Sequence, residues 1–267
     1  MSDHTVAVLG AGKMGELVLA GILRAGRPAV ATARRAERAA ELTDRHGVTV
    51  LPNDQAVSGA DILVIGVKPQ DAGKLLDEIA PHVTPDKLVV SLCAGLPTAF
   101  FAARLSDDVP VVRVMTNTPA LVGAAVSAIS PGARATAEHV AIAEELFRPL
   151  GATVHVPEYQ QDAVTALSGS GPAYYYLIAE AMIEAGVRLG LPRQVAHQLI
   201  VQTAVGSAAM LRDSGEHPAL LREAVTSPAG TTAAALREME NHGVRAALGA
   251  ALEAARDRAR EIADDMR

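Results

Sequence analysis

The 267-residue sequence predicts an α/β domain followed by an all-α domain. Short apolar runs alternate with helix-forming segments through the first half, as in proteins built on a parallel sheet. Strand signals stop after about Pro157, and the rest of the chain reads as helices separated by short turns that contain Gly, Pro or Ser. We therefore predict one domain over residues 1–157 and a second over residues 158–267.

Local sequence patterns predict the strands and helices of the first domain. Residues 62–66 and 88–92 are almost wholly apolar, which is typical of parallel strands buried on both faces. Together with these two, strands are expected over residues 5–9, 29–32, 49–51, 111–115, 124–129 and 153–156. One helix is expected to begin directly after Gly15, and others over residues 35–46, 71–81, 98–105 and 135–150.

The composition is that of a globular protein, with 49% hydrophobic residues, 20% charged residues and a net charge of −6. The acidic balance argues against nucleic acid or an anionic membrane as the main partner. The uncharged stretch 114–133 is interrupted by polar and helix-breaking residues, so no membrane span is expected.

The cellular compartment is indicated by two features. A strand begins almost at the first residue, which predicts no signal peptide. Cys93 is the single cysteine, which fits the reducing cytoplasm. The eight histidines lack metal-ligand spacing, so no metal site is predicted.

Residues 10–15 read Gly-Ala-Gly-Lys-Met-Gly between the first strand and a helical segment. Gly10 permits a tight turn, Gly12 lets the backbone approach a pyrophosphate, and Gly15 lets the helix pack close to the strand. This order favours a Rossmann-like dinucleotide-binding domain over a plain glycine-rich turn. The loop residues predicted to contact the dinucleotide are Gly10, Ala11, Gly12, Lys13, Met14 and Gly15.

The end of the second strand indicates which dinucleotide is bound. An NAD site normally carries an Asp or Glu there for the ribose 2′-hydroxyl, whereas this chain has Ala33-Arg34-Arg35. Two guanidinium groups suit a 2′-phosphate, which they can bind through paired hydrogen bonds. We predict NADP as the cofactor, with NADPH preferred and NADH possible. The alternative is that both arginines are solvated residues of a first helical turn.

Three unusual loops follow strands at the edge where open parallel sheets bind ligands. They are Val67-Lys68-Pro69-Gln70, Cys93-Ala94-Gly95 and residues 116–120. The small residues of the second loop would let a nicotinamide ring lie close to the backbone. Lys68 either offers a cation to the cofactor or to an acidic substrate, or is a solvated loop lysine. Cys93 is interpreted as a small packing residue rather than a nucleophile, because no base lies near it in the sequence.

The helical half contains two further unusual segments. Residues 166–174 include two glycines and a proline, which weaken a helix and indicate a close backbone approach, either at a helix crossing or at a wall of the active site. Residues 227–232 read Ser-Pro-Ala-Gly-Thr-Thr and precede a run of helix formers that reaches Gly243. Free N–H groups and the helix dipole there favour a carboxylate or phosphate site, and an ordinary N-cap after a turn is the alternative.

Taken together, these motifs closely resemble the pyrroline-5-carboxylate reductase family, over essentially the whole chain and in the same order. The matching segments are residues 10–15, 67–70, 113–120, 167–174 and 225–232. The last two are specific to this family rather than to Rossmann proteins in general. Three positions depart from the family pattern, because Thr116 and Ala229 stand where Pro and Gly are expected and Ala33 stands where a polar residue is common. A methyl group at 229 would crowd the loop if that residue needs a positive φ.

The resemblance implies a reaction and a set of site residues. Family members reduce the ring imine of L-1-pyrroline-5-carboxylate to L-proline with NAD(P)H, the final step of proline biosynthesis. By position, the backbone of Ser227, Gly230 and Thr231 would bind the substrate carboxylate, and the Thr232 hydroxyl would bond the ring nitrogen as the catalytic group. The resemblance also implies substrate contacts at Lys68 and Glu158. The implied cofactor contacts beyond the glycine-rich loop are Thr32, Arg34, Arg35, Asn53, Val67, Lys68, Pro69, Cys93, Ala94 and Asn117.

The absence of an obvious His-Asp pair fits this chemistry. A protonated imine is already electrophilic, so the site must supply orientation rather than a strong acid. The alternatives are a related cyclic-imine reductase or a β-hydroxyacid dehydrogenase-like oxidoreductase. The second would want a Lys on the helix after Asp162, where the sequence has none. A non-catalytic NADP-binding regulator would not need Thr232 beside a carboxylate site.

The helical domain also predicts self-association. Apolar residues recur at helical spacing through residues 179–187 and 195–211, more than one small domain can bury. The family forms dimers through interlocked helical domains, often assembled into larger rings. We therefore predict a homodimer or a higher homo-oligomer such as a decamer, with a small-molecule substrate as the other partner.

Overall fold

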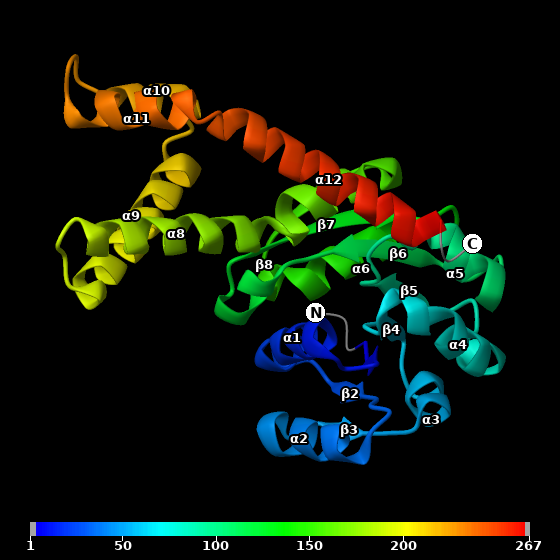
Figure 1. Cartoon of the computed structure of the whole chain (residues 1–267). Helices are drawn as coiled ribbons and strands as arrows, with labels where there is room; N and C mark the ends of the chain where they lie inside the picture. The colour runs from blue at the N-terminus through cyan, green and yellow to red at the C-terminus, as the bar shows by residue number, and fades with distance from the viewer. Residues whose placement is uncertain (1–3, 265–267) are drawn as a thin grey trace. The chain divides into compact units, whose positions relative to one another are not determined.

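The computed structural model, which describes residues 4–264, is built around one eight-stranded sheet (Figure 1). The strand order is β3-β2-β1-β4-β5-β6-β7-β8, with β1 to β6 parallel. The strands are β1 (Val6–Leu9), β2 (Ala29–Ala31), β3 (Thr49–Val50), β4 (Ile62–Ile65), β5 (Leu88–Ser91), β6 (Val111–Met115), β7 (Ala125–Pro131) and β8 (Gly151–His155). This order confirms the predicted Rossmann-like α/β fold.

The direction of the sheet reverses between β6 and β7. Strand β7 pairs with β6 in antiparallel register and with β8 in parallel register, so β7 and β8 both run opposite to β1–β6. The connection from β6 to β7 holds only a 3-10 turn at Thr118–Val122, too short for the crossover that a parallel pair needs. The sequence analysis predicted the strand without assigning its direction, although the length of this connection can be read from the sequence.

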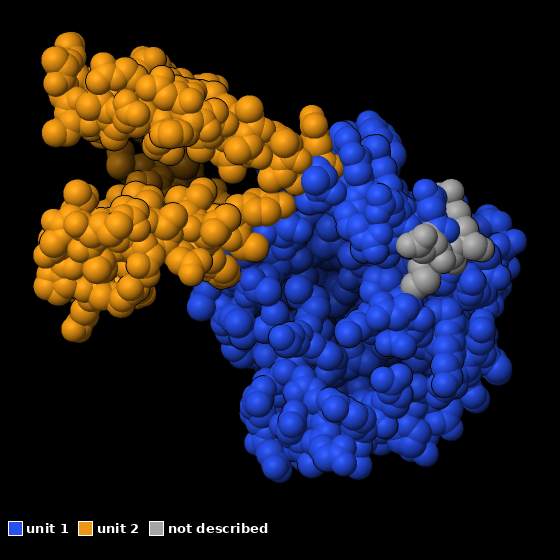
Figure 2. Space-filling view, in the orientation of Figure 1, with its two compact units in different colours: residues 1–172, 254–267 blue, residues 173–253 orange. Residues whose placement is uncertain are grey.

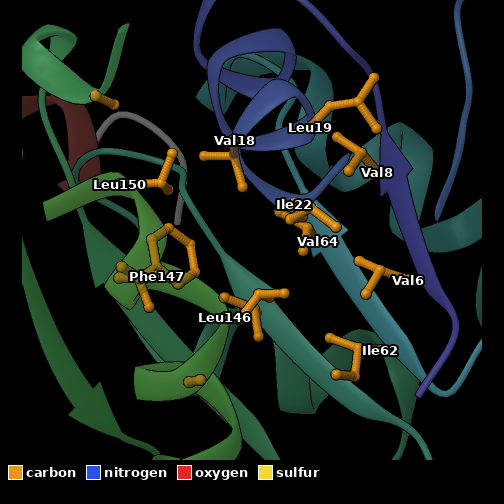
Figure 3. Packing of buried hydrophobic residues seen from close by; sticks show 14 of the residues in the cluster. Val6, Val8, Val18, Leu19, Ile22, Ile62, Val64, Leu146, Phe147 and Leu150 are labelled. Atoms are coloured by element: carbon orange, nitrogen blue, oxygen red, sulfur yellow. The ribbon is translucent and has the colours of Figure 1, made fainter. Parts of the chain in front are cut away.

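Alternate residues of the central strands supply two separate cores. Val6, Val8, Ile62 and Val64 point to one face, where α1 (Lys13–Arg24) and α6 (Ala137–Phe147) cover them (Figure 3). The residues between them point to the other face, which is covered by α3 (Asn53–Ser58), α4 (Pro69–Ile79) and α5 (Thr98–Leu105). Because the side-chain period of a strand is two, an uninterrupted apolar run fills both faces, which is the pattern that the sequence showed.

The predicted helix bounds hold to within a few residues. The helix expected over 35–46 is α2 (Ala36–His46), and the one expected over 135–150 is α6 followed by a 3-10 turn at Arg148–Leu150. Helix α3 is an addition that the sequence analysis missed, since its six residues are too short to show a helical period.

After β8 the described chain is helical. Helix α7 (Gln161–Val164) runs through a π-helical turn, Thr165–Gly169, towards α8 (Gly171–Arg188). Then follow α9 (Arg193–Asp213), α10 (Pro218–Ala224), α11 (Thr231–Asn241) and α12 (Val244–Asp264). Among residues 4–264, no helix combines the length and the apolar character needed to cross a membrane.

By internal contacts the chain divides into two units, which Figure 2 shows in different colours. Unit 1 comprises residues 1–172 and 254–267, and unit 2 comprises residues 173–253. The sheet ends at His155, close to the predicted end of strand structure. A domain boundary at residues 157/158 stays a prediction, and its outer limits, residues 1–3 and 265–267, lie outside the described part of the chain.

Candidate active site

The glycine-rich loop joins β1 to α1 and is supported by the end of β2. Gly10 has φ +74°, a left-handed conformation that suits glycine, and a Cβ added there would lie 2.1 Å from Val67 Cγ1. The Gly10 N–H donates to Thr32 Oγ1 (3.0 Å), and the Ala11 N–H donates to the Thr32 carbonyl (3.0 Å). Thr32 is buried and supports the loop through these bonds, while a direct cofactor contact from it stays a prediction.

Gly12 leaves open space above the loop. It is the N-cap of α1, and a Cβ added there would meet only the Gly10 carbonyl oxygen, at 4.0 Å. Helix α1 begins at Lys13, so its first N–H groups lack intrahelical acceptors and the positive end of its dipole lies at the loop. An open backbone surface at a helix N-terminus suits a pyrophosphate, so this loop fits a dinucleotide.

The residues predicted to bind the ribose and its phosphate lie after β2 and β3. The Arg34 side chain is 84% exposed, and its Nη1 lies 3.8 Å from Asp71 Oδ1. Arg35 is exposed and is the N-cap of α2. Asn53 begins α3 and donates from Nδ2 to Glu78 Oε1 (3.0 Å). The two guanidinium groups are therefore accessible to a ligand, whereas the Asn53 amide already has an acidic partner.

The sheet brings the three predicted loops to one edge. Strands β4, β5 and β6 are parallel neighbours, so Val67, Cys93 and Asn117, which follow them, lie together at the carboxyl edge. Cys93 Sγ lies 3.4 Å from the Val67 carbonyl oxygen and joins the first two loops. Lys68 is exposed as the N-cap of α4, and Pro69 is the first residue of that helix. Their contacts with a cofactor stay predictions.

Cys93 is 1% exposed, and burial raises the pKa of its thiol to about 12. Ala94, beside it, is half-buried. The thiolate is the reactive form of cysteine, and at pH 8 a thiol with this pKa is roughly one part in ten thousand thiolate. We expect iodoacetamide at pH 8 to leave Cys93 unmodified in the folded protein and to label it readily in urea, as mass spectrometry would measure. Equal labelling rates in the two states would contradict this burial.

The glycine-rich part of the helical half packs against the end of β6. The Asn117 amide donates from Nδ2 to the Ser168 carbonyl (3.1 Å), and its Oδ1 accepts from the Val126 N–H (3.2 Å). A Cβ added to Gly169 would lie 3.3 Å from Met115 Sδ, so this glycine allows a close approach. The segment therefore packs beside the loop predicted to hold the nicotinamide, which favours the active-site wall over a simple helix crossing.

Glu158, predicted as a substrate ligand, is hydrogen-bonded to Thr98, the first residue of α5. Its carboxylate accepts from the Thr98 N–H at 2.6 Å and from Thr98 Oγ1 at 2.9 Å. Two donors of the first helical turn thus engage both carboxylate oxygens, an arrangement that stabilises a helix N-terminus. Substrate binding by Glu158 stays a prediction, and its carboxylate would have to share these bonds with any ligand.

A partly buried ion pair between β6 and α7 was missed by the sequence analysis. Arg113 lies in β6, is 4% exposed, and places Nη2 3.4 Å from Asp162 Oδ1. Arg260 in α12 approaches the other oxygen of Asp162, at 4.0 Å. An arginine between valines in a buried strand was the available signal, because a charge buried there needs a partner.

The predicted substrate loop is a tight turn that leads into α11. The Gly230 N–H donates to the Ser227 carbonyl (3.0 Å), with Pro228 and Ala229 between them. Ala229 has φ +57°. This is the positive φ at which its methyl group was expected to crowd the loop. The Gly230 donor is thus already engaged by the turn, and a Cβ there would lie 2.4 Å from Ser227 Oγ. Gly230 supports the loop by its small size, and carboxylate binding through its own N–H stays a prediction.

Helix α11 has Gly230 as its N-cap and begins with Thr231 and Thr232. The N–H groups of its first turn have no intrahelical acceptor, and no acidic side chain lies in that turn. The first turn of α11 therefore carries two hydroxyl groups and several N–H groups without intrahelical acceptors, at the positive end of the helix dipole. This is a suitable site for a carboxylate with a neighbouring polar atom.

Replacing Ala229 by glycine is expected to raise the unfolding free energy by about 0.5–1 kcal/mol, because glycine adopts positive φ without steric cost. Thermal unfolding followed by circular dichroism would measure this as a higher Tm. Ala224→Gly, within α10, is the control and should lower the Tm, since glycine weakens a helix. A lower Tm for Ala229→Gly would contradict the assigned φ.

Comparison with known proteins agrees with these features. A family model described as pyrroline-5-carboxylate reductase dimerisation matches residues 158–262, and one described as NADP oxidoreductase, coenzyme F420-dependent, matches residues 5–95. The chain is 42% identical over 265 residues to the pyrroline-5-carboxylate reductase of Corynebacterium melassecola, covering 97% of this chain and 98% of that protein. It is 40% identical over 271 residues to the Pseudomonas aeruginosa enzyme of the same name, covering 100% and 99%.

The fold agrees as closely as the sequence. The crystal structure of Plasmodium falciparum pyrroline carboxylate reductase with NADP bound superposes with a TM-score of 0.90 at 28% identity, covering 98% of this chain and 99% of that one. Sequence and fold agree over nearly the whole length, and both the dinucleotide loop and the turn before α11 lie within the matched models. The chain therefore belongs to the pyrroline-5-carboxylate reductase family.

Proposed function

We propose that this protein reduces L-1-pyrroline-5-carboxylate to L-proline with NADPH, the final step of proline biosynthesis. The observation that carries the proposal is the N-terminus of α11, where free N–H groups and the Thr232 hydroxyl meet after a strained turn. A small substrate with a carboxylate beside a ring nitrogen matches that pair of features. The dinucleotide loop of β1 and α1 supplies the second requirement of a reductase.

The chain's own residues bind and orient the substrate. We assign its carboxylate to Ser227 and to the first turn of α11, including Thr231, where the helix dipole favours an anion. We assign the ring nitrogen to the Thr232 hydroxyl, which can accept from the protonated imine and stay bonded as the nitrogen becomes an amine. Lys68 would add a cation for the substrate or the cofactor phosphates, and Glu158 is a further candidate contact.

The cofactor fits residues of unit 1. When bound, NADPH supplies the hydride that reduces the C=N bond. The glycine-rich loop would hold the pyrophosphate, and Arg34 and Arg35 would hold the 2′-phosphate, with Asn53 beside the ribose. The nicotinamide would lie by the edge loops, near Val67, Pro69, Cys93, Ala94 and Asn117.

A turnover assay tests this function directly. The purified protein is mixed with L-1-pyrroline-5-carboxylate and either NADPH or NADH, and the loss of absorbance at the reduced nicotinamide band is followed. We expect proline as the product and faster turnover with NADPH at low cofactor concentration. The control is a cyclic imine without the carboxylate, which should be reduced poorly because the α11 site would lack its anion. Equal rates with the two imines would contradict the assigned carboxylate site.

The protein carries the dimerisation region of its family and forms a homo-oligomer. Unit 2 itself supports this, because in residues 173–253, all of which the structure describes, Ala196 alone is buried. Helices α8 and α9 expose many large apolar side chains, which a partner copy would cover. The exposed set on these helices includes Tyr175, Tyr176, Leu177, Ile178, Met182, Val195, Leu199, Val201, Val205, Met210 and Leu211. We propose a dimer through this unit, assembled further into a ring such as a decamer.

The oligomer is expected to be obligate. Light scattering coupled to size exclusion should give a mass of at least twice the 27.6 kDa of one chain, with all activity in that peak. Leu199→Glu would place a charge on the exposed apolar face and should shift the mass towards the monomer, whereas Val154→Glu, at a similarly exposed position on β8 of unit 1, is the control. A stable, active monomer of the unaltered protein would contradict the proposal.

We further propose that the protein acts in the cytoplasm. A single buried cysteine without a disulfide partner suits a reducing compartment. Cell fractionation with an antibody to the protein would test this, and recovery outside the cytoplasmic fraction would contradict it.

A further inference from the structure

An ion cluster lies directly behind the glycine-rich loop and has no part in the site described above. Its centre is Glu16, in the first turn of α1, whose side chain is 15% exposed. Two arginines and a histidine of α2 surround its carboxylate: Arg38 Nη2 at 2.5 Å, Arg45 Nη1 at 2.6 Å and His46 Nε2 at 2.9 Å. Burial by itself would raise the pKa of Glu16, but hydrogen bonds from Arg38 and His46 lower it to about 2. The carboxylate is therefore ionised and closely matched by cations.

Arg38 differs from the other cations because it also contacts the loop. Its Nε donates to the Ala11 carbonyl (3.1 Å), while Nη2 binds Glu16 and Nη1 binds Glu41 (2.9 Å). The side chain is only 18% exposed, so these bonds are shielded from solvent competition. One planar guanidinium thus joins the loop, the start of α1 and α2 in a fixed geometry.

The Ala11 carbonyl belongs to the same peptide unit as the Gly12 N–H. That peptide unit lies in the middle of the loop, where Gly12 leaves open space for a phosphate. Glycine tolerates many backbone conformations, so a peptide plane beside it can rotate at little cost. Such a rotation would exchange the positions of a donor and an acceptor in the loop. The bond from Arg38 to the Ala11 carbonyl opposes it, together with the bond from the Gly12 N–H to the Gly10 carbonyl (2.7 Å). The preceding peptide is held separately, because the Ala11 N–H donates to the Thr32 carbonyl (3.0 Å).

The cluster also neutralises a charge that would oppose ligand binding. Glu16 lies one residue after the loop, and an unpaired carboxylate there would repel a pyrophosphate. Arg45 contributes to this neutralisation but is 60% exposed and is bonded to Glu16 rather than to the loop. The two arginines therefore separate two effects: both compensate the charge of Glu16, but of the two only Arg38 also bonds the Ala11–Gly12 peptide.

We propose that Arg38 is a positioning residue for the dinucleotide, which holds the Ala11–Gly12 peptide in its binding orientation through the Ala11 carbonyl. This rests on the proposed function only in assuming that the ligand is NADP(H). Arg38 would act on the shared pyrophosphate part of the cofactor. Its loss should therefore weaken NADPH and NADH by the same factor, unlike the loss of a residue that binds the 2′-phosphate.

Direct binding measurements can test the proposal without turnover. The chain has no tryptophan, so the fluorescence of NADPH or NADH reports binding with little protein background. For Arg38→Ala we expect the Kd of both cofactors to rise about tenfold, the size expected for one charged hydrogen bond. Arg45→Ala, the matched control, should change both Kd values less than about twofold, because exposed ion pairs contribute little. With saturating NADPH, kcat and the KM for the imine should stay unchanged in both variants.

Conservative variants keep the test decisive. If Arg38→Ala does not fold, Arg38→Lys and Arg38→Gln replace it, since neither can bond Ala11, Glu16 and Glu41 at once, and each should raise both Kd values. Four results would overturn the proposal: unchanged Kd values in a folded Arg38 variant, a lowered Tm with unaltered binding, equal weakening by Arg38→Ala and Arg45→Ala, or a loss confined to NADPH. An unaltered protein that binds NADPH but does not reduce the imine would refute the proposed function and leave this inference intact.

Discussion

Replacing Thr232 by alanine is expected to lower kcat about tenfold to a hundredfold while changing the KM for the imine substrate much less. The N–H groups at the start of α11 would still bind the carboxylate, so ground-state binding should survive. The lost hydroxyl would leave the ring nitrogen without its partner as it changes from imine to amine. An interaction that matters mainly in the transition state appears in kcat.

Two further substitutions at this position separate the hydroxyl from the shape of the side chain. Thr232→Ser keeps the hydroxyl and should retain most of the activity, whereas Thr232→Val keeps the branched shape and should behave like the alanine variant. Initial rates over a range of imine concentrations at saturating NADPH give both parameters. If Thr232→Ala left kcat unchanged, the residue would be only part of an ordinary helix start.

Replacing Arg34 by alanine is expected to weaken NADPH selectively, by about 1.5–3 kcal/mol, the cost of one charge-assisted contact with a phosphate. The guanidinium is exposed, and within residues 4–264 its one ion-pair contact is with Asp71 at 3.8 Å, so it is accessible to a ligand. Because NADH lacks the 2′-phosphate, its KM should change little. The cofactor preference of the enzyme should therefore shift towards NADH.

The role of Arg34 is decided by whether its loss weakens NADPH more than NADH. Arg34→Lys keeps the charge but not the fork of donors, so it should lose part of the preference. The ratio of kcat/KM for NADPH and NADH, measured at one salt concentration, gives the shift. An equal rise in KM for the two cofactors would show that Arg34 does not bind the 2′-phosphate.

Much of the fold could be predicted from the sequence because local and global preferences agree in it. The apolar runs that became β4 and β5 have no other stable place than the centre of a parallel sheet. The glycine-rich loop places a strand before it and a helix after it. The direction of β7 was not assigned, although the short β6–β7 connection favours the antiparallel pairing seen in the structure, and α3 was missed because it is shorter than two helical turns.

The site was less predictable than the fold, for a physical reason. Motifs showed which loops gather at the carboxyl edge, but not which of their polar groups are already bonded within the protein. Glu158 binds Thr98, and the Asn117 amide bonds Ser168 and Val126, although both residues had been predicted as ligand contacts. Arg38 carries no motif, since its contacts join residues from two helices and a loop that only the folded chain brings together.

Ala229 affects the proposed substrate turn through the relative populations of its backbone conformations. A non-glycine residue at positive φ is less favourable than glycine by roughly 1 kcal/mol, so we expect the shape of the turn seen here to compete with shapes in which Ala229 has negative φ. A substrate that binds one shape must draw the loop into it, and its apparent affinity falls in proportion to the fraction of molecules already there. A factor of about five in substrate affinity can therefore be set by one methyl group that bonds neither the carboxylate nor the ring nitrogen. If the turn before α11 binds the substrate as proposed, we expect its occupancy to depend partly on a backbone equilibrium at Ala229.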